Sequence, residues 1–283
     1  MKSQIEVLNL PCGYRVYSEF TECANAKGTI LMVNGAFATV TSLHHTIKYL
    51  RENFNVFAFD LPFAGKSQEL NDPGLILDKE EEVHIILDII EKLQPEYAIS
   101  MSWGGVSLLL ALAQRPQCIR RAVLGSFAPS LNGAMREYLQ QALKLLASNN
   151  LEDNAKLFNN SLGMHLPRLF KAFNAQYLKQ FAATSRGQIE HHLNHILALD
   201  AKSYQNVISG IEVPLLFING ELDRYTTVES IRAMKLLSAT MRSACISGAG
   251  HFLDMEGRSQ WREMRTLITE YLLEDFEATL EHS

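Results

Sequence analysis

The stretch Ser100-Met101-Ser102-Trp103-Gly104-Gly105 decides the fold of this chain, because it joins an apolar run, Tyr97–Met101, to an apolar helical pattern, Gly105–Arg115. A serine between the end of a strand and the start of a helix sits on a sharp turn that tolerates only small neighbours, so its hydroxyl stands exposed above the sheet edge. This is the G-x-S-x-G nucleophile elbow, with Ser100 in place of the first glycine. That replacement weakens the motif. Taken alone, the stretch also fits an ordinary turn with a helix-capping serine.

Short β-branched or aromatic runs alternate with helical patterns on both sides of this turn, which predicts βα units and a mostly parallel sheet. The expected strands are Ile5–Leu8, Tyr14–Phe20, Thr29–Val33, Val56–Asp60, Tyr97–Met101, Arg121–Ser126, Val213–Ile218 and Ser243–Ser247. The expected helices are Ser42–Arg51, Asp78–Leu93, Gly105–Arg115, Glu229–Leu237 and Ser259–Leu273.

The alternation stops between about Pro129 and Gly210, where the pattern is helical and contains no good strand. We therefore expect an α/β fold with a mostly parallel, eight-stranded sheet, helices on both faces and an inserted helical cap. Residues 1–128 and 211–283 would form the core, and residues 129–210 the cap.

Two further loops carry polar residues after expected strands: Asn219-Gly220-Glu221-Leu222-Asp223 and Gly248-Ala249-Gly250-His251. With Ser102 they give the chain order Ser, Asp, His, which differs from the orders in the two common serine-protease folds. All three residues follow strand ends, which in open α/β sheets lie at the edge where ligands bind.

Nucleophilic chemistry explains why these three residue types belong together. A serine hydroxyl needs a base to take its proton, and an imidazole can later return that proton to the leaving group. We assign Ser102 as nucleophile, His251 as general base and acid, and Asp223 as the carboxylate that orients the imidazole. The main competitor for the acid is Glu221. Asp254 and Glu256 are less favoured, because they follow the histidine at the opening of a helix.

A developing oxyanion needs preorganised donors, normally the amide after the nucleophile and an amide in the loop after the third strand. These are the backbone amides of Trp103 and, in the loop Asn34-Gly35-Ala36-Phe37, of Ala36. Asn34 stands where many such enzymes carry histidine. The Pro- and Gly-bearing stretch Phe59–Ser67 is interpreted as a structural turn.

Composition limits the possible partners and location. The chain has 283 residues, 47% hydrophobic and 20% charged, with a net charge of −5, which excludes a disordered, collagenous or disulfide-scaffold protein. It has no block of Lys or Arg, so we expect no nucleic-acid partner. Four scattered cysteines and a start without a signal-peptide pattern predict a cytoplasmic protein. The uncharged run Tyr97–Gln114 is interpreted as a buried strand and helix, and no transmembrane segment is expected.

No metal or cofactor is expected. His191 and His195 lie four residues apart on one predicted helix face, but no third ligand or H-E-x-x-H order accompanies them. The chain contains no G-x-G-x-x-G or G-x-x-x-x-G-K-[ST] motif, so a nucleotide cofactor is not predicted either.

The elbow, the order of the triad and the helical insertion together resemble the α/β-hydrolase superfamily. Within it, five runs resemble the RhlA family, whose members bear the name rhamnosyltransferase, and the likeness extends from about Ile5 to Leu273. They are Val-Asn-Gly-Ala-Phe-Ala-Thr from Val33, Phe-Asp-Leu-Pro-Phe-Ala-Gly-Lys-Ser from Phe59, Ser-Trp-Gly-Gly from Ser102, Phe-Ile-Asn-Gly-Glu-Leu-Asp-Arg-Tyr-Thr-Thr from Phe217 and Gly-His-Phe-Leu-Asp-Met-Glu from Gly250. The 3-hydroxyacyl carrier-protein:CoA transacylase family PhaG is similar in almost the same runs.

The resemblance implies an acyltransferase that joins two (R)-3-hydroxyacyl chains, taken from acyl carrier protein or CoA thioesters, into 3-(3-hydroxyalkanoyloxy)alkanoate, the lipid precursor of rhamnolipids. The alternatives are a transacylase with CoA as acceptor, and a plain esterase or thioesterase. The resemblance places the acyl-enzyme on Ser102, with Asp223 and His251 completing the triad, and implies a transient partnership with acyl carrier protein.

The insertion would roof an acyl tunnel, although ordinary burial against the sheet explains its apolar residues equally well. The candidates are Leu139, Ala142, Leu143 and Leu146 within Met135–Ala147, and the run Leu169, Phe170, Phe173 and Tyr177. A basic patch of Arg115, Arg120 and Arg121 would dock an acidic carrier protein.

Overall fold

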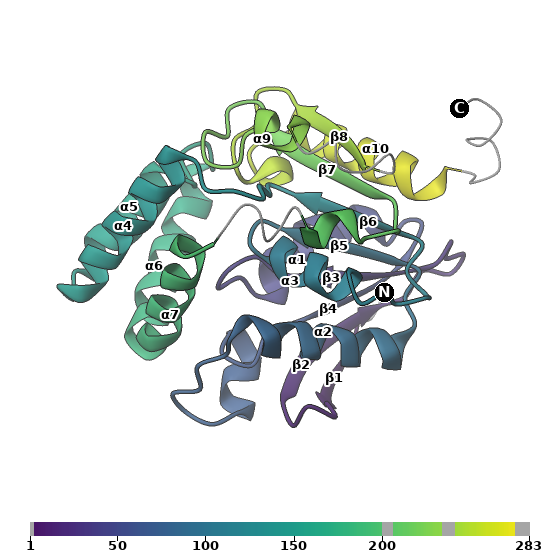
Figure 1. Ribbon diagram of the computed structural model, residues 1–283, viewed down its shortest axis with the longest axis horizontal. Helices are drawn as coiled ribbons and strands as arrows, with labels where there is room; N and C mark the ends of the chain where they lie inside the picture. The colour runs from purple at the N-terminus through teal and green to yellow at the C-terminus, as the bar shows by residue number, and fades with distance from the viewer. Residues whose placement is uncertain (1–2, 200–205, 234–240, 275–283) are drawn as a thin grey trace.

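The protein is built on one eight-stranded sheet, described here from a computed structural model that covers residues 3–199, 206–233 and 241–274 (Figure 1). The strand order is β1-β2-β4-β3-β5-β6-β7-β8. β1 pairs antiparallel with β2, β2 pairs antiparallel with β4, and every later pair is parallel, which confirms the predicted mostly parallel sheet. The strands are β1 (Ser3–Asn9), β2 (Arg15–Thr21), β3 (Thr29–Val33), β4 (Asn55–Phe59), β5 (Tyr97–Met101), β6 (Arg121–Gly125), β7 (Leu215–Gly220) and β8 (Met241–Ile246).

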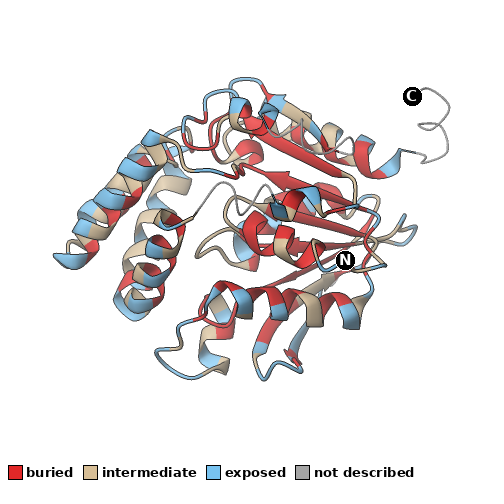
Figure 2. Cartoon of the chain, in the orientation of Figure 1, coloured by how far each residue is buried: buried red, intermediate tan, exposed pale blue. Residues whose placement is uncertain are grey.

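Helices cover both faces of the sheet, as predicted. Alternate residues of β3 separate two cores: Leu31 and Val33 share one with α2 (Lys79–Leu93) and α3 (Gly104–Leu112), while Ile30 and Met32 share the other with α1 (Val40–Leu50) and α10 (Arg258–Leu273). Buried residues accordingly lie along the inner strands β3 to β7 and on the inner sides of these helices in Figure 2. The remaining short elements of the core are η1 (Gly65–Leu70), α9 (Val228–Arg232) and η3 (Leu253–Met255).

Between β6 and residue 199 the chain forms four helices: α4 (Gly133–Ala147), α5 (Leu151–Asn160), α6 (Arg168–Thr184) and α7 (Arg186–Leu197). Residues 206–209 are also helical. Helices α4 to α7 pack on one another and stand together beside the sheet (Figure 1). No strand lies within 129–199 or 206–210, in agreement with the helical pattern of the sequence. The division of the protein into core and cap at residues 129 and 210 remains a prediction.

Some predicted boundaries are wrong for identifiable reasons. The predicted strand Val213–Ile218 lies two residues too early, because Pro214 has no N–H for the ladder while Asn219 and Gly220 still pair with β8. The predicted helix to Arg115 ends instead at Leu112, and Arg115 has a left-handed φ of 57°. The predicted helix Glu229–Leu237 corresponds to α9, which ends at Arg232. Residues 234–237 of that prediction lie outside the described part of the protein.

The uncharged run Tyr97–Gln114 divides into β5 and α3, as interpreted from the sequence. Across the described ranges of residues, no helix has the length and apolar character needed to span a membrane.

Gly104 offers a direct test of how tightly the elbow is packed. A Cβ built there would lie 2.2 Å from the backbone oxygen of Asn34, so we expect Gly104→Ala to lower the free energy of unfolding by about 1–3 kcal/mol. Gly133→Ala is a matched control, because Gly133 also begins a helix but has no atom within 4 Å of the added carbon. Urea denaturation measures both, and equal stability of the two variants would contradict the packing argument.

Candidate active site

Ser102 occupies a strained turn between β5 and α3. Its φ is 50°, a left-handed conformation that costs a non-glycine residue roughly 1–2 kcal/mol. The turn persists because the Ser102 N–H donates to the carbonyl of Gly125 at the end of the neighbouring strand β6, at 2.7 Å. Ser100, which replaces the motif glycine, is fully buried in β5. The local geometry is therefore that of a nucleophile elbow.

The structure brings the three sequence-predicted residues Ser102, His251 and Asp223 into one hydrogen-bonded series. Ser102 Oγ lies 2.9 Å from His251 Nε2, and His251 Nδ1 lies 2.8 Å from Asp223 Oδ2. The histidine is 7% exposed and the aspartate 4% exposed, so both polar groups are largely shielded from water. In this arrangement the carboxylate holds the proton on Nδ1, and Nε2 is left to accept the serine proton.

Asp223 is held as a carboxylate by the loop after β7. Burial by itself raises the pKa of this carboxyl, but the His251 ring and the surrounding hydrogen bonds outweigh burial and lower the pKa. The backbone amides of Tyr225 and Thr226 donate to Oδ1, at 2.9 and 3.2 Å, and the Thr226 hydroxyl donates to Oδ2. Asn219 Nδ2 braces the same loop through the carbonyl of Thr226, at 2.8 Å.

The other three carboxylates considered from the sequence have different partners. Glu221 accepts from Ser247 Oγ and from the backbone amide of Gly248, both in the loop that precedes His251. Asp254 accepts from the hydroxyls of Thr46 and Tyr49, on α1. Glu256 accepts from the amides of Gly250 and Phe252, on either side of the histidine, at 2.6 and 3.0 Å. Asp223 alone of the four is hydrogen-bonded to the imidazole.

Several residues that position the histidine loop were missed from the sequence. The hydroxyl of Ser126, at the end of β6, donates to the backbone carbonyl of His251. Gly220 lets the two loops meet, because a Cβ there would lie 2.1 Å from the backbone oxygen of Gly250. Ser126 and His251 are 125 residues apart, and no local pattern signals such a pair. The Gly-rich character of both loops was the one available hint.

The loop after β3 lies against the elbow. A Cβ built on Gly35 would lie 3.4 Å from Ser102 Cβ, and Asn34 Nδ2 ties the loop to the carbonyl of Phe59 at 2.6 Å. Phe37 has a left-handed φ of 58°, and its carbonyl accepts from the hydroxyl of Tyr177 on α6, at 2.7 Å. Within the described residues, the backbone amides of Ala36 and Trp103 donate to no other group. Both amides therefore remain available to a ligand beside Ser102.

The stretch Phe59–Ser67 is a structural turn, as interpreted. Asp60 is buried and accepts from the amides of Val40 and Lys66, at 2.7 and 2.9 Å, and Ser67 Oγ donates to the Asp60 carbonyl. These bonds fix the start of α1 relative to β4.

The proposed basic patch of Arg115, Arg120 and Arg121 is wrong. Arg121 is buried, and its guanidinium donates to the carbonyl of Tyr271, while Arg115 pairs with Glu212 at 2.9 Å. Arg121 also begins β6, so this group lies at the end of the sheet opposite the triad. Spacing in the sequence placed the charges together but could not say which end of the sheet they occupy.

The candidate tunnel residues of the insertion divide into two groups. Leu139, Ala142 and Leu146 of α4 are buried in the same core as α2 and α3, which is ordinary burial. Leu169 and Phe173 of α6 are 67% and 61% exposed, so they do not roof an enclosed tunnel.

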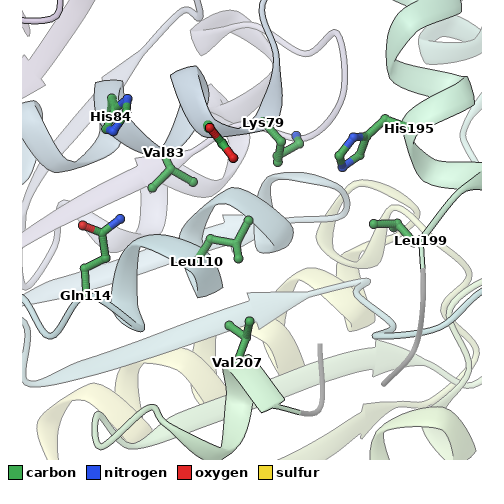
Figure 3. A pocket seen from close by; sticks show the side chains of 9 residues that line it. Lys79, Val83, His84, Leu110, Gln114, His195, Leu199 and Val207 are labelled. Atoms are coloured by element: carbon green, nitrogen blue, oxygen red, sulfur yellow. The ribbon is translucent and has the colours of Figure 1, made fainter. Parts of the chain in front are cut away.

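A pocket of about 490 Å³ lies between α2, α3 and α7 (Figure 3). Two of its residues, Lys79 and His195, also contact the Trp103 ring, with Lys79 Nζ 5.2 Å from the ring centroid. None of the three triad residues lines this pocket. The lining residues are Lys79, Glu80, Val83, His84, Leu110, Gln114, His195, Leu199 and Val207.

Comparison with known proteins agrees with this geometry. Residues 28–257 match the model of the α/β-hydrolase fold family. The structure of an esterase from Exiguobacterium antarcticum superposes with a TM-score of 0.79, and the match covers 96% of this chain and 100% of the esterase chain. The two sequences are 16% identical, so this likeness concerns the fold alone.

Relatives with similar sequences identify a group within this family. An (R)-3-hydroxydecanoyl-ACP:CoA transacylase from Pseudomonas putida is 39% identical over 272 residues, which cover 96% of this chain, or 92% of that protein. A protein of the same name from Pseudomonas aeruginosa is also 39% identical, over 96% and 91%. These names correspond to the transacylase alternative of the sequence analysis. The chain is an enzyme of the α/β-hydrolase family and belongs to the group within it that includes these transacylases.

Proposed function

We propose that this enzyme transfers a 3-hydroxyacyl group from an acyl carrier protein thioester to the thiol of coenzyme A, through an ester on Ser102. The observation that carries the proposal is the hydrogen-bonded series from Ser102 through His251 to Asp223, at the strand ends of the sheet. The similarity to named transacylases over 96% of the chain supports the choice of substrates.

Acylation begins when Ser102 Oγ attacks the thioester carbonyl carbon and His251 Nε2 takes the hydroxyl proton. The backbone amides of Trp103 and Ala36 then donate to the oxyanion, as the sequence predicts for this pair. Collapse of the tetrahedral intermediate breaks the carbon–sulfur bond, and His251 returns its proton to the leaving phosphopantetheine thiolate. Throughout these steps Asp223 stabilises the imidazolium and does not itself take up a proton.

Deacylation repeats these steps with a new nucleophile. His251 takes the proton of the CoA thiol, the sulfur attacks the ester carbonyl, and the Ser102 oxygen leaves with the proton held on Nε2. Transfer exceeds hydrolysis only if the acceptor is positioned and water is kept away, and positioning of this kind is worth roughly 7–11 kcal/mol in ideal cases. The burial of His251 and Asp223 supports such a shielded site.

A second acceptor is favoured by the runs that resemble RhlA. If the 3-hydroxyl of a second hydroxyacyl thioester replaces the CoA thiol, the acyl group passes from Ser102 to that oxygen and the product is a 3-(3-hydroxyalkanoyloxy)acyl thioester. Hydrolysis of this thioester then releases 3-(3-hydroxyalkanoyloxy)alkanoate, the rhamnolipid precursor. If water replaces the CoA thiol, the enzyme is an esterase or thioesterase. All three reactions share the acylation steps, after which His251 deprotonates a thiol, a hydroxyl or water.

We place this chemistry in the cytoplasm. The four cysteines are all unpaired, as a reducing compartment favours. Acyl carrier protein would be a transient partner that delivers its thioester to the strand ends.

The first test is a product analysis. Purified enzyme is incubated with (R)-3-hydroxydecanoyl carrier protein, with and without CoA, and products are identified by mass spectrometry. We expect 3-hydroxydecanoyl-CoA when CoA is present, and a mass increase of one acyl group on the enzyme when it is absent. Ser102→Ala should remove both signals and lower turnover at least about 10⁴-fold. A dimeric ester would support the second acceptor, and free hydroxy acid alone would contradict acyl transfer.

The second test concerns the acid. Asp223→Asn keeps the shape of the side chain but favours the wrong imidazole tautomer, so kcat should fall by about 10³–10⁴-fold. Asp254→Asn is the matched control, because Asp254 is also buried but bonds to Thr46 and Tyr49 instead of the imidazole. Steady-state kinetics on folded protein compares them, and a comparable loss in both variants would remove the assignment of Asp223.

A further inference from the structure

Among the residues that the structure describes, two buried ring nitrogens at the elbow have no hydrogen-bond partner: Nε1 of Trp103 and Nε2 of His192. The two rings lie edge to face, with centroids 5.0 Å apart and planes at 77°. His192 belongs to α7, in the insertion, and is 3% exposed. Buried polar atoms are nearly always paired, so two orphans in contact indicate a missing group that both can bind.

His192 lies against both segments that would supply the oxyanion donors. One of these segments begins with Trp103, which directly follows Ser102. The other contains Ala36 and Phe37, and the His192 ring lies 4.9 Å from the Phe37 ring. The hydroxyl of Tyr177 on α6 donates to the backbone carbonyl of Phe37 and so holds Phe37 in place. A group bound between the Trp103 and His192 rings would therefore lie beside the residue that directly follows Ser102 and beside the loop after β3.

The two rings are in contact, and their unpaired nitrogens are complementary in chemistry. An indole N–H only donates, whereas a neutral imidazole also offers one accepting nitrogen. Burial, the Lys79 ammonium and the neighbouring His195 and His191 hold the pKa of His192 well below its usual range, so the ring is neutral. Lys79 and His195, which also contact the Trp103 ring, line the pocket in Figure 3.

A hydroxyl group fits this pair, because it accepts one hydrogen bond and donates another. We propose that Trp103 Nε1 and His192 Nε2 bind the 3-hydroxyl of the acyl group, and that this contact selects hydroxylated over plain acyl groups. In the bound state the indole N–H donates to the hydroxyl oxygen, and the hydroxyl donates to Nε2. The inference rests on the proposed function and assigns a specificity site within it. A plain acyl group would leave both nitrogens unpaired. Sites whose buried polar groups stay unpaired with the wrong ligand discriminate most strongly against that ligand.

The wild-type enzyme provides the first test. Transfer to CoA is compared for carrier-protein thioesters of (R)-3-hydroxydecanoate, (S)-3-hydroxydecanoate and decanoate. We expect kcat/KM for decanoate to be lower by at least about 10-fold than for the (R)-hydroxy substrate. The (S)-substrate should also be poorer, because its hydroxyl points away from the fixed pair. Equal use of decanoate and the (R)-substrate would overturn the inference while leaving acyl transfer intact, whereas failure to transfer any of the three would overturn the proposed function itself.

Variants then identify the residues. In His192→Leu the ratio of kcat/KM for the (R)-hydroxy substrate to that for decanoate should fall toward one, and His192→Gln, whose amide can still accept, should restore part of it. His191→Leu is the matched control, because this exposed neighbour on the same helix should leave the ratio unchanged. If His192→Leu does not fold, Trp103→Phe removes the indole donor and keeps an aromatic ring. An unchanged ratio in a folded His192 or Trp103 variant would overturn the assignment.

Discussion

The site depends on one close backbone approach, in which the carbonyl of Asn34 passes directly against the α-carbon of Gly104. Since no side chain fits there, the loop after β3 and the start of α3 can lie together. Ser102 is then held in its left-handed turn, with its amide bonded to Gly125 rather than to its own helix. The backbone strain at the serine is stabilised by strand pairing on both sides of β5. A hydroxyl placed this way has little freedom to turn away from the histidine.

The acid and histidine loops are held by a second close contact, between Gly220 and Gly250. Around it, Glu221 and Glu256 accept backbone amides of the histidine loop, and Ser126 donates to the His251 carbonyl. These groups do not touch the reacting atoms. They satisfy polar backbone groups of the irregular histidine loop, and at the buried residues Gly250 and His251 an unpaired backbone group would be costly. Asp223 and His251 are therefore held within hydrogen-bond distance although neither residue lies in a helix or a strand.

The helical insertion contributes to the site rather than only covering it. The Tyr177 hydroxyl of α6 donates to the Phe37 carbonyl, and the Gln188 side chain of α7 bonds both backbone groups of Leu77, just before α2. These bonds help fix the insertion to the core. α7 then brings His192 against the ring of Trp103. In our proposal, the core performs acyl transfer while this contact decides which acyl groups are accepted. Selection would thus depend on a contact between the insertion and the core, next to the residue that performs the reaction.

The sequence by itself determined the strand and helix alternation, the elbow at Ser102 and the helical character of the insertion, because each depends on local sterics or on burial that repeats along the chain. It named Asp223 ahead of three other carboxylates, but the tertiary structure decided which of them faces the imidazole. Ser102 and His251 are 149 residues apart, and Asp223 and His251 are 28 apart, so their distances follow from strand order. Packing of α7 brought His192 against Trp103 at the elbow. No local pattern predicts that contact, since it depends on how elements far apart in sequence pack together.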